Sequence, residues 1–496
     1  MTGFEKLEKL IAKKGSRLVL GIDPSKVEIE IAAKNFKGDL EAYLMSIIDD
    51  CAEYIVALKP QLAFYEKSPE MRQMAMRLMK HAREKHGLVG ILDVKRGDIA
   101  NTQAHWAAAD IANFSPDIVV LNAYMGGRDV VQPYLDTDKN LCVYVLVATS
   151  NPSARDFQDK LCGGLMNYQQ MAMHARKIDS ARIGYVIGST KPDAIRNVRM
   201  LEAEIGMQPG HVLSPGFGRQ GGDLEFVKHG GANAIYPISS GLTNPEYFPS
   251  GTKTSKEVAK LWRDEMNKAF ESSIPTKTLK EHVVDLLLDA GLLVAPKTDD
   301  VALWPFLKRG RDKLKSLGLP HGDVDTMRKY LADGVLSKDD FTNLFLNLRN
   351  LMGHPELRRL MAVLYVQMID KSGVKYDRIA SVAYGAINTG DLVSYILDAP
   401  GILLRKERGE ETTHSDILGD IKKGERIIMI EDVATTGSSL IKDVKMLRET
   451  FGVVVTDAYI FIKRTEEAEK AYRDNGINMH YIMDLPALRK IVGVKD

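Results

Sequence analysis

The chain has 496 residues, of which 45% are hydrophobic and 27% charged, a composition that is ordinary for globular domains and excludes a disordered chain. Its 67 lysines and arginines nearly balance its 66 aspartates and glutamates, so no overall basic field exists to attract nucleic acid or an anionic membrane. The length favours about three domains, or two if one of them is large.

The cysteines and the apolar runs predict a cytoplasmic enzyme. Cys51, Cys142 and Cys162 have no metal-binding spacing and leave an odd count, which fits a reducing compartment. The opening string MTGFEKLEKLIAKK predicts a charged amphipathic helix rather than a signal peptide. No apolar run reaches membrane-spanning length.

Short apolar runs bounded by Gly, Pro or Asn alternate with longer amphipathic stretches through the first half of the chain. Eight repeats of this alternation predict an α/β fold, a parallel (β/α)8 TIM barrel of about 250 residues. The expected strands are Leu18–Gly21, Ile55–Leu58, Val89–Leu92, Ile118–Leu121, Val143–Val147, Ile183–Ile187, His211–Leu213 and Ala234–Tyr236. The expected helices include Pro69–Lys85, Thr102–Asn113, Leu165–Lys177 and Pro192–Ile205.

The pattern breaks near residues 271–276, which predicts a barrel over residues 1–273 and a second domain over 274–496. A helical lead-in extends to about residue 334, and alternation then returns, so the second domain is expected to be a smaller α/β domain. Its expected helices are Lys277–Leu292, Leu303–Leu317, Pro320–Gly334 and Pro355–Ile369. Its expected strands are Phe345–Leu348, Ile379–Ala383, Gly401–Leu404, Arg426–Ile430 and Val453–Ile460.

Charged side chains follow several expected barrel strands. Asp23 follows the first strand, Lys59 the second, and Asp93 and Lys95 the third. Catalytic groups of barrels lie where strands end, so these side chains are expected to meet at one rim. The period of two along a strand predicts that Asp93 and Lys95 share a face, with Val94 opposite. A lysine held protonated beside a carboxylate suits protonation of a carbanion, whereas the alternative is a surface ion-pair cluster.

Two loops after the later strands are rich in glycine and small polar residues. Residues 214–222 follow the seventh expected strand, and residues 236–241 follow the eighth. Barrels commonly bind phosphate there through backbone amides. Either loop alone could be a simple turn, but their positions together predict a phosphate site.

Six ordered strings carry a family resemblance, namely GIDPS, LKPQLAFYE, ILDVKRGDIANT, ATSNPS, SPGFGRQGGD and YPISSGL. Over roughly residues 1–270 they resemble orotidine 5′-monophosphate decarboxylases of the prokaryotic type. The resemblance implies decarboxylation without a cofactor, with proton delivery by Lys95, in a homodimer where Asp98 enters the partner's site. The implied catalytic residues are Lys59, Asp93, Lys95 and Asp98. The implied substrate contacts are Asp23 and Thr102 at the ribose, Ser150 at the pyrimidine, and Gln220 and Gly241 in the phosphate loops.

One position departs from this family pattern. The family usually carries arginine just before the glycine of the last phosphate loop, and in this chain Ser240 stands there. Arg219, in the preceding phosphate loop, is the expected substitute.

A second set of candidate ligand-binding residues follows the apolar strand Arg426–Ile430. Glu431 and Asp432 come next, and a small polar loop follows them. Paired carboxylates suit the vicinal hydroxyls of a ribose, while loop amides and hydroxyls suit its phosphate. The alternative is an ordinary strand–turn–helix whose Thr or Ser caps the helix. The expected loop contacts are Thr435, Thr436, Gly437, Ser438 and Ser439.

This string resembles the phosphoribosyl pyrophosphate signature of type I phosphoribosyltransferases. Over about residues 320–496 the chain resembles orotate phosphoribosyltransferases. Residues 335–349 resemble the N-terminal hairpin of that family, Tyr384 its tyrosine, and Arg405 and Lys406 the start of its flexible catalytic loop. The resemblance implies Mg²⁺ bridging the pyrophosphate, with no direct protein ligand.

The expected flexible loop departs from that family's pattern. It lacks a further lysine and instead carries Glu410 and Glu411. Arg408, His414 or Lys338 could serve in a shifted register, or the domain could be catalytically silent.

Together, the two resemblances imply a bifunctional uridine monophosphate synthase with the decarboxylase first. The implied substrates are small molecules, namely orotate, phosphoribosyl pyrophosphate and orotidine monophosphate. Two alternatives stay open: a decarboxylase carrying a silent transferase-like domain for binding or oligomerisation, and a non-catalytic nucleotide-binding scaffold.

Overall fold

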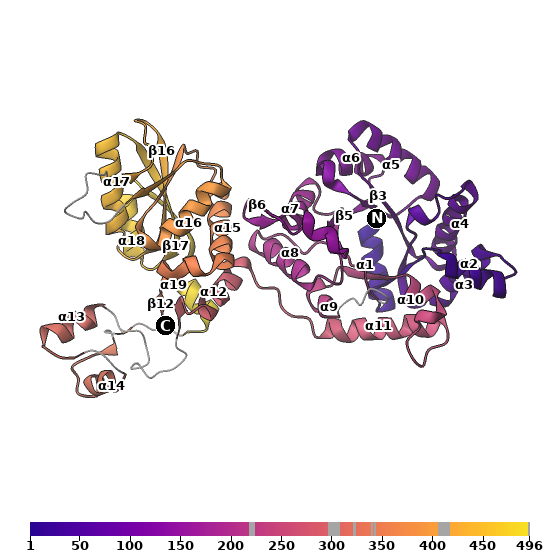
Figure 1. The fold of residues 1–496 in the computed structure, drawn as a ribbon, viewed down its shortest axis with the longest axis horizontal. Helices are drawn as coiled ribbons and strands as arrows, with labels where there is room; N and C mark the ends of the chain where they lie inside the picture. The colour runs from indigo at the N-terminus through magenta and orange to yellow at the C-terminus, as the bar shows by residue number, and fades with distance from the viewer. Residues whose placement is uncertain are drawn as a thin grey trace. The chain divides into compact units, whose positions relative to one another are not determined.

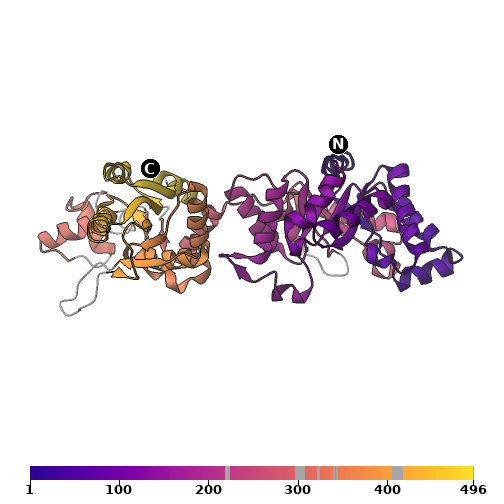
Figure 2. The same cartoon turned by 90° about the horizontal axis from the view of Figure 1, so that it is seen from above.

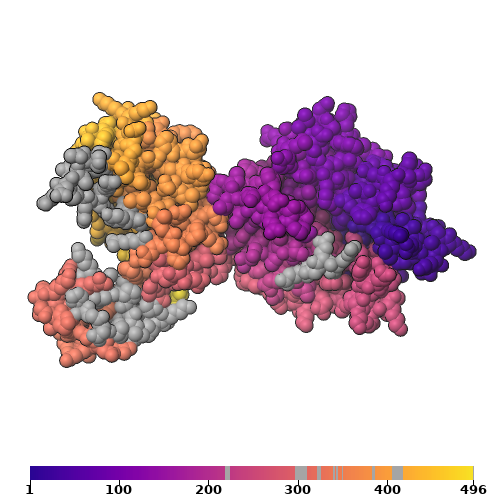
Figure 3. All heavy atoms as spheres, in the orientation of Figure 1, coloured from indigo at the N-terminus to yellow at the C-terminus, as the bar shows by residue number. Residues whose placement is uncertain are grey.

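The computed structural model describes residues 1–217, 224–295, 308–320, 324–338, 341, 344–404 and 417–494. The chain divides into two compact units, Met1–Thr276 and Lys277–Asp496, whose ribbons are drawn in Figure 1. Figure 3 shows the same view with all heavy atoms as spheres. Among the described residues, none of the helices combines the length and the hydropathy that a bilayer crossing requires.

Eight parallel strands close into a barrel in the first unit, which confirms the predicted fold. Their order around the barrel is β1-β10-β9-β8-β5-β4-β3-β2. The strands are β1 (Leu18–Gly21), β2 (Ile55–Lys59), β3 (Val89–Arg96), β4 (Ile118–Leu121), β5 (Cys142–Ala148), β8 (Ile183–Ile187), β9 (Val212–Leu213) and β10 (Ala234–Ile238). A small antiparallel hairpin, β6 (Leu161–Cys162) with β7 (Leu165–Met166), stands apart from the barrel.

Helices surround these strands, as Figures 1 and 2 show from two directions. They are α1 (Gly3–Lys14), α2 (Lys26–Asn35), α3 (Leu40–Cys51), α4 (Pro69–His86), α5 (Ala100–Phe114), α6 (Gly127–Thr137), α7 (Asn167–Ile178), α8 (Pro192–Glu204), α9 (Glu225–Gly230), α10 (Ser240–Thr243) and α11 (Ser255–Glu271).

The first helix packs into the barrel core. Thr2 and Glu5 form a reciprocal capping box that fixes where α1 begins. Phe4 and Leu7 are then buried in one cluster with strand residues such as Val19 and Tyr144. The backbone N–H of Gly3 donates to the carbonyl of Asn140, just before β5, so α1 lies where strands begin. The opposite end, where the strands finish, is left for ligand binding.

A six-stranded sheet forms the second unit, in the order β15-β14-β13-β16-β17-β18, and β15 pairs antiparallel while the other pairs are parallel. The strands are β13 (Arg378–Ser381), β14 (Gly401–Leu404), β15 (Ile417–Leu418), β16 (Arg426–Ala434), β17 (Val454–Lys463) and β18 (Asn478–Asp484). The helices are α12 (Leu279–Asp289), α13 (Lys308–Ser316), α14 (Val324–Ala332), α15 (Pro355–Ser372), α16 (Ala383–Ile396), α17 (Ser438–Phe451), α18 (Glu466–Asp474) and α19 (Leu485–Val492). This arrangement confirms the predicted α/β class of the second domain.

The expected hairpin over residues 335–349 is wrong for the residues that the structure describes. β12 (Phe345–Leu346) pairs antiparallel with β11 (Leu293–Val294), far upstream in the chain. Leu336 is instead buried beside Leu314 of α13 and Met327 of α14. Apolar burial against these two helices therefore replaces the local strand pairing that a hairpin would need.

A buried charge cluster ties α7, α8 and β8 together in the first unit. Glu202 of α8, 1% exposed, lies 3.3 Å from the Nη1 atom of Arg176 and 2.7 Å from that of Arg199. The hydroxyl of Tyr185 donates to the same carboxylate at 2.9 Å. Both arginines are nearly fully buried, so the Glu202 carboxylate supplies negative charge that balances theirs.

We expect Glu202→Ala to lower the free energy of unfolding of the first unit by about 3–5 kcal/mol, because two buried guanidinium groups would lose their carboxylate. Urea unfolding followed by circular dichroism measures this loss. The matched control is Asp193→Ala on the same helix, where the carboxylate is 77% exposed and an effect below about 1 kcal/mol is expected. Equal losses in the two variants would contradict the argument.

Candidate active site

A cavity of about 650 Å³ lies at the ends of the barrel strands. Its wall includes five of the predicted site residues, Asp23, Lys59, Asp93, Lys95 and Ser150, as well as Ser240. Other lining residues come from the loops after β2, β5, β9 and β10, among them Gln61, Thr149, Asn151, Gln158, Pro215, Gly216, Phe217 and Ser239. The side chains predicted at the carboxyl ends of the strands therefore line one cavity.

Asp93 is shared by two lysines in this cavity. The ammonium of Lys59, at the end of β2, lies 3.1 Å from Asp93 Oδ2. The ammonium of Lys95 lies 2.7 Å from Oδ1 and 2.8 Å from Oδ2. Lys59 and Asp93 are each 5% exposed, whereas Lys95 is exposed. One buried carboxylate thus holds an outer ammonium at the cavity surface.

Electrostatic interactions favour the charged forms of Lys59 and Asp93. Burial alone would lower the pKa of Lys59, but the carboxylates of Asp23 and Asp93 outweigh it and raise that pKa. Burial alone would raise the pKa of Asp93, but the ammonium groups of Lys59 and Lys95 outweigh it and lower that pKa. Each ion is therefore stabilised by its neighbours rather than by water.

The expected period of two does not explain how Lys95 reaches Asp93. Lys95 has a φ of +48°, and the pairing of β3 with β4 shifts register between Asp93 and Arg96. This irregularity re-aims the side chain, so the contact is made through a bulged rather than a regular strand. A positive φ in a non-glycine residue costs a conformational energy on the order of 1 kcal/mol. Such strain is found at functional sites.

Arg96 holds the strand end that follows the irregularity. Its guanidinium donates to both oxygens of the buried Asp110 of α5, at 2.8 and 3.0 Å. It also lies over the ring of Trp106 at 3.6 Å. The sequence suggested no role for Arg96, because its partner lies on the next helix and no local pattern links the two.

Asp23 is also fixed by partners that the sequence did not reveal. One of its oxygens accepts the backbone N–H of Gln61 at 2.9 Å, and the other accepts the hydroxyl of Ser239 at 2.9 Å. Both partners lie within strings of the family resemblance, but the contacts join segments far apart in sequence. On the opposite wall, Gln158 bonds the backbone and side chain of Thr149, which steadies the loop carrying Ser150.

Three predicted substrate or catalytic residues do not line the cavity. Asp98 is partly exposed in the loop after β3 and accepts the N–H of Ile99 at 2.8 Å. Thr102 is exposed on α5, and Gly241 is buried in α10. Gln220 lies outside the described residues, as does Arg219.

In the second unit, Glu431 and Asp432 lie inside β16 rather than beyond its end, which corrects the predicted strand boundary. The strand continues because its pairing with β17 extends to Ala434. The carboxylate of Glu431, 5% exposed, accepts the hydroxyl of Tyr472 from α18 at 2.5 Å. Burial and this carboxylate raise the pKa of Tyr472, so its hydroxyl remains a donor.

The loop after β16 leads into α17. Thr435, Thr436 and Ser438 are exposed and Ser439 is partly exposed. Gly437 occupies the N-cap position with a φ of +71°, and no side chain caps the helix. The alternative of a Thr or Ser cap is therefore wrong. Uncapped amides at a helix N-terminus favour an anion.

The remaining predicted transferase residues are placed only in part. Tyr384 lies in the first turn of α16. Lys338 is exposed. The expected flexible loop falls outside the described residues, including Arg405, Lys406, Arg408, Glu410, Glu411 and His414.

Comparison with known proteins identifies relatives of the barrel and of the whole chain. Residues 16–235 match the family model "Orotidine 5'-phosphate decarboxylase / HUMPS family". The orotidine 5′-phosphate decarboxylase of Dechloromonas aromatica is 34% identical over 238 residues, which are 47% of this chain and 85% of that protein. A Nostoc protein named "Bifunctional enzyme PyrF/PyrE" is 23% identical over 99% of this chain and 96% of its own length. The structure of Leishmania donovani UMP synthase aligns with a TM-score of 0.49 and 24% identity, over 99% of this chain and 95% of that one.

The lowered pKa of Asp93 predicts a pH-dependent share of stability. A carboxyl whose pKa is lower in the folded state stabilises the fold above its unfolded pKa of about 3.9 and loses that effect as the pH falls through its folded pKa. We therefore expect the free energy of unfolding to fall less between about pH 7 and about pH 3 in Asp93→Asn than in the unsubstituted chain. Urea unfolding at the two pH values measures this difference. Asp156→Asn, at an exposed carboxylate, is the control, and an unchanged pH dependence in Asp93→Asn would contradict the argument.

Proposed function

The chain belongs to the orotidine 5′-phosphate decarboxylase family, and we propose that its barrel converts orotidine 5′-monophosphate to uridine 5′-monophosphate and carbon dioxide. The observation that carries this proposal is the group Lys59–Asp93–Lys95 in the cavity at the strand ends. It supplies a charged ammonium, held by a buried carboxylate, within a site of a size suited to a small ligand.

Lys95 carries the chemistry of this proposal. When the bond to the substrate carboxylate breaks, carbon dioxide leaves and the electron pair stays on the ring carbon. The Lys95 ammonium stabilises that charge and delivers its proton to the carbon, so the step needs no cofactor. Asp93 keeps Lys95 oriented through two contacts of 2.7 and 2.8 Å. Lys59, bound to the same carboxylate, fixes Asp93 in turn.

The other cavity residues orient the nucleotide. Asp23, already held by two hydrogen bonds, is assigned to the ribose, and Ser150 to the pyrimidine. Gln220 and Gly241 are assigned to the phosphate loops. Arg219 is assigned the role of the arginine that Ser240 replaces.

A homodimer is part of the proposal. Asp98 and Thr102 do not line the cavity of their own chain, and both are accessible to solvent. This placement suits residues that complete the site of a second copy, as the family resemblance implies. We also place the protein in the cytoplasm, since its three cysteines are free.

The second unit is assigned the preceding step, transfer of a phosphoribosyl group from phosphoribosyl pyrophosphate to orotate. Support comes from the whole-chain similarity to the Nostoc bifunctional protein. The β16–α17 loop offers uncapped helix amides for a phosphate, and Asp432 is partly exposed beside them for ribose hydroxyls. These oxygen and amide groups suit a substrate that carries its own Mg²⁺, which would neutralise pyrophosphate. In this scheme the second unit makes orotidine monophosphate, which is the substrate of the barrel.

We expect Lys95→Ala to lower kcat for decarboxylation by at least about 1000-fold, because the proton donor and its charge are both removed. Binding of uridine monophosphate should survive, as calorimetry would show. The control is Lys67→Ala, which removes an exposed lysine outside the cavity. Retained decarboxylation in Lys95→Ala would favour a non-catalytic nucleotide-binding scaffold.

We expect a chelator of divalent ions to abolish phosphoribosyl transfer and leave decarboxylation unchanged. Only the pyrophosphate-bearing substrate needs Mg²⁺ in this scheme. Separate steady-state assays of the two half-reactions, with and without chelator and with Mg²⁺ restored, measure this. Absence of orotate-dependent pyrophosphate release with Mg²⁺ present would leave a decarboxylase with a silent transferase-like domain.

A further inference from the structure

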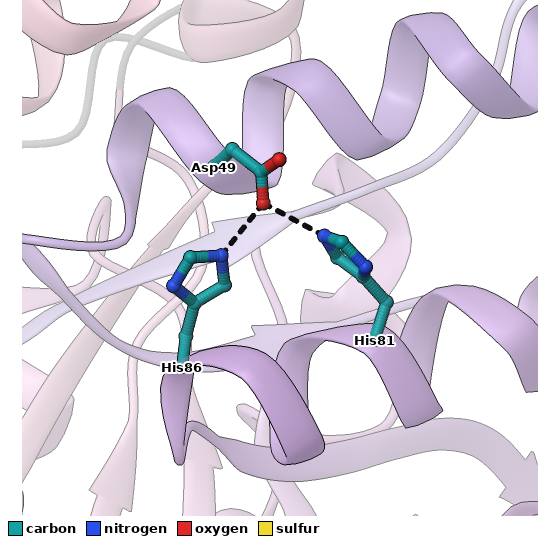
Figure 4. Close-up of side chains that lie close together, drawn as sticks. All are labelled: Asp49, His81 and His86. Carbon is teal, nitrogen blue, oxygen red and sulfur yellow. Dashed lines mark hydrogen bonds and ion pairs between the residues drawn. The ribbon is translucent and has the colours of Figure 1, made fainter.

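Three side chains of types that can ligate a metal meet on the outside of the barrel, apart from the cavity described above. Asp49 comes from α3, and His81 and His86 come from α4, as Figure 4 shows. One ligand atom from each residue lies within 4.8 Å of the others. Their side chains are 35%, 19% and 18% exposed, so they are partly shielded but reachable from solvent.

The two imidazoles are aimed at one point. The Nε2 atom of His81 lies 2.7 Å from Asp49 Oδ1, and that of His86 lies 2.6 Å from the same oxygen. Figure 4 shows the two rings converging on this carboxylate from one helix. Zinc sites likewise gather imidazole nitrogens and carboxylate oxygens around one point.

The surroundings also favour a cation. Asp49 and His86 lie in the last turns of α3 and α4, where the aligned peptide dipoles give helix ends a partial negative charge. The ammonium of Lys85 already lies 2.7 Å from Asp49 Oδ2. Its side chain is 55% exposed and can turn into solvent, so it does not block a second cation.

We propose that Asp49, His81 and His86 bind one divalent transition-metal ion, with zinc the best match, and that water completes its coordination. Two imidazole nitrogens and one carboxylate oxygen form a common zinc ligand set. Zinc bonds of about 2.0–2.1 Å in tetrahedral geometry separate the ligand atoms by about 3.3 Å. The nitrogen–oxygen contacts of 2.7 and 2.6 Å therefore need to open by about 0.6–0.7 Å.

The ion would act as a structural clip. α3 ends at Cys51 shortly before β2, and α4 ends at His86 shortly before β3. The site thus lies where strands begin, at the end of the barrel away from Lys59 and Asp93. Residues at that end serve stability rather than chemistry. The clip would fasten the two helices that lead into the strands carrying those residues.

The test uses the full chain without a histidine tag, stripped of metal by a chelator and dialysed. Zinc titration by calorimetry should give one tight site per chain, and zinc in excess should raise the Tm by about 5 °C. His81→Ala and His86→Ala should each weaken zinc binding at least about 10-fold and abolish the Tm rise. Decarboxylation in both variants should match that of the unsubstituted chain at moderate temperature.

The matched control is His174→Ala, which removes an exposed histidine on α7 outside the cluster and should leave zinc affinity unchanged. Cobalt substitution gives a readout that does not depend on the variants folding, because its visible d–d absorption reports nitrogen and oxygen ligands in a low-coordinate site. Absence of that absorption in the unsubstituted chain, or equal zinc affinity in His81→Ala, would overturn the proposal.

Discussion

The charged cavity of the first unit is organised around a buried carboxylate that two ammonium groups share. Asp93 is 5% exposed, and an isolated charge at such a position would be strongly destabilising. It is tolerated because β2 and β3 are neighbours in the barrel, so that Lys59 and Lys95 reach it together. Such a cluster is weak support for folding, since apolar residues would fill the space at lower cost. The surrounding structure supplies the stability instead.

That stability comes from the end of the barrel where the strands begin. Phe4 and Leu7 of α1 are buried among strand residues there, and Glu202 neutralises two buried arginines on the helices outside. The carboxyl ends of the strands can then tolerate buried charges and a strained backbone. Lys95 adopts its positive φ just before Arg96, whose bidentate bond to Asp110 anchors β3 to α5. The anchored Arg96 thus stabilises the chain next to the backbone distortion that directs the Lys95 side chain toward Asp93.

The sequence predicted the barrel well because its strands are short, buried apolar runs, and such runs dominate the local pattern. It predicted β18 poorly for the same reason: Asn478–Asp484 is a sheet-edge strand with mixed exposure, and the expected elements did not include it. In the cavity, residue types at strand ends identified Asp23, Lys59 and Asp93. The period of two failed at Lys95, because a bulge depends on pairing with β4. The bonds from Gln61 and Ser239 to Asp23 join distant segments, which no local pattern encodes.

The candidate ligand site of the second unit differs from the barrel cavity. It relies on backbone geometry at the β16–α17 loop rather than on ion pairs. A Cβ at Gly437 would lie 2.3 Å from the ring of Tyr472, so glycine is required both by this contact and by the positive φ. The same tyrosine donates its hydroxyl to Glu431. Any side chain at Gly437 would therefore displace the ring that orients Glu431. Tyr472 of α18 thus links the turn at Gly437 to Glu431 of β16, although α18 itself carries no part of the signature motif.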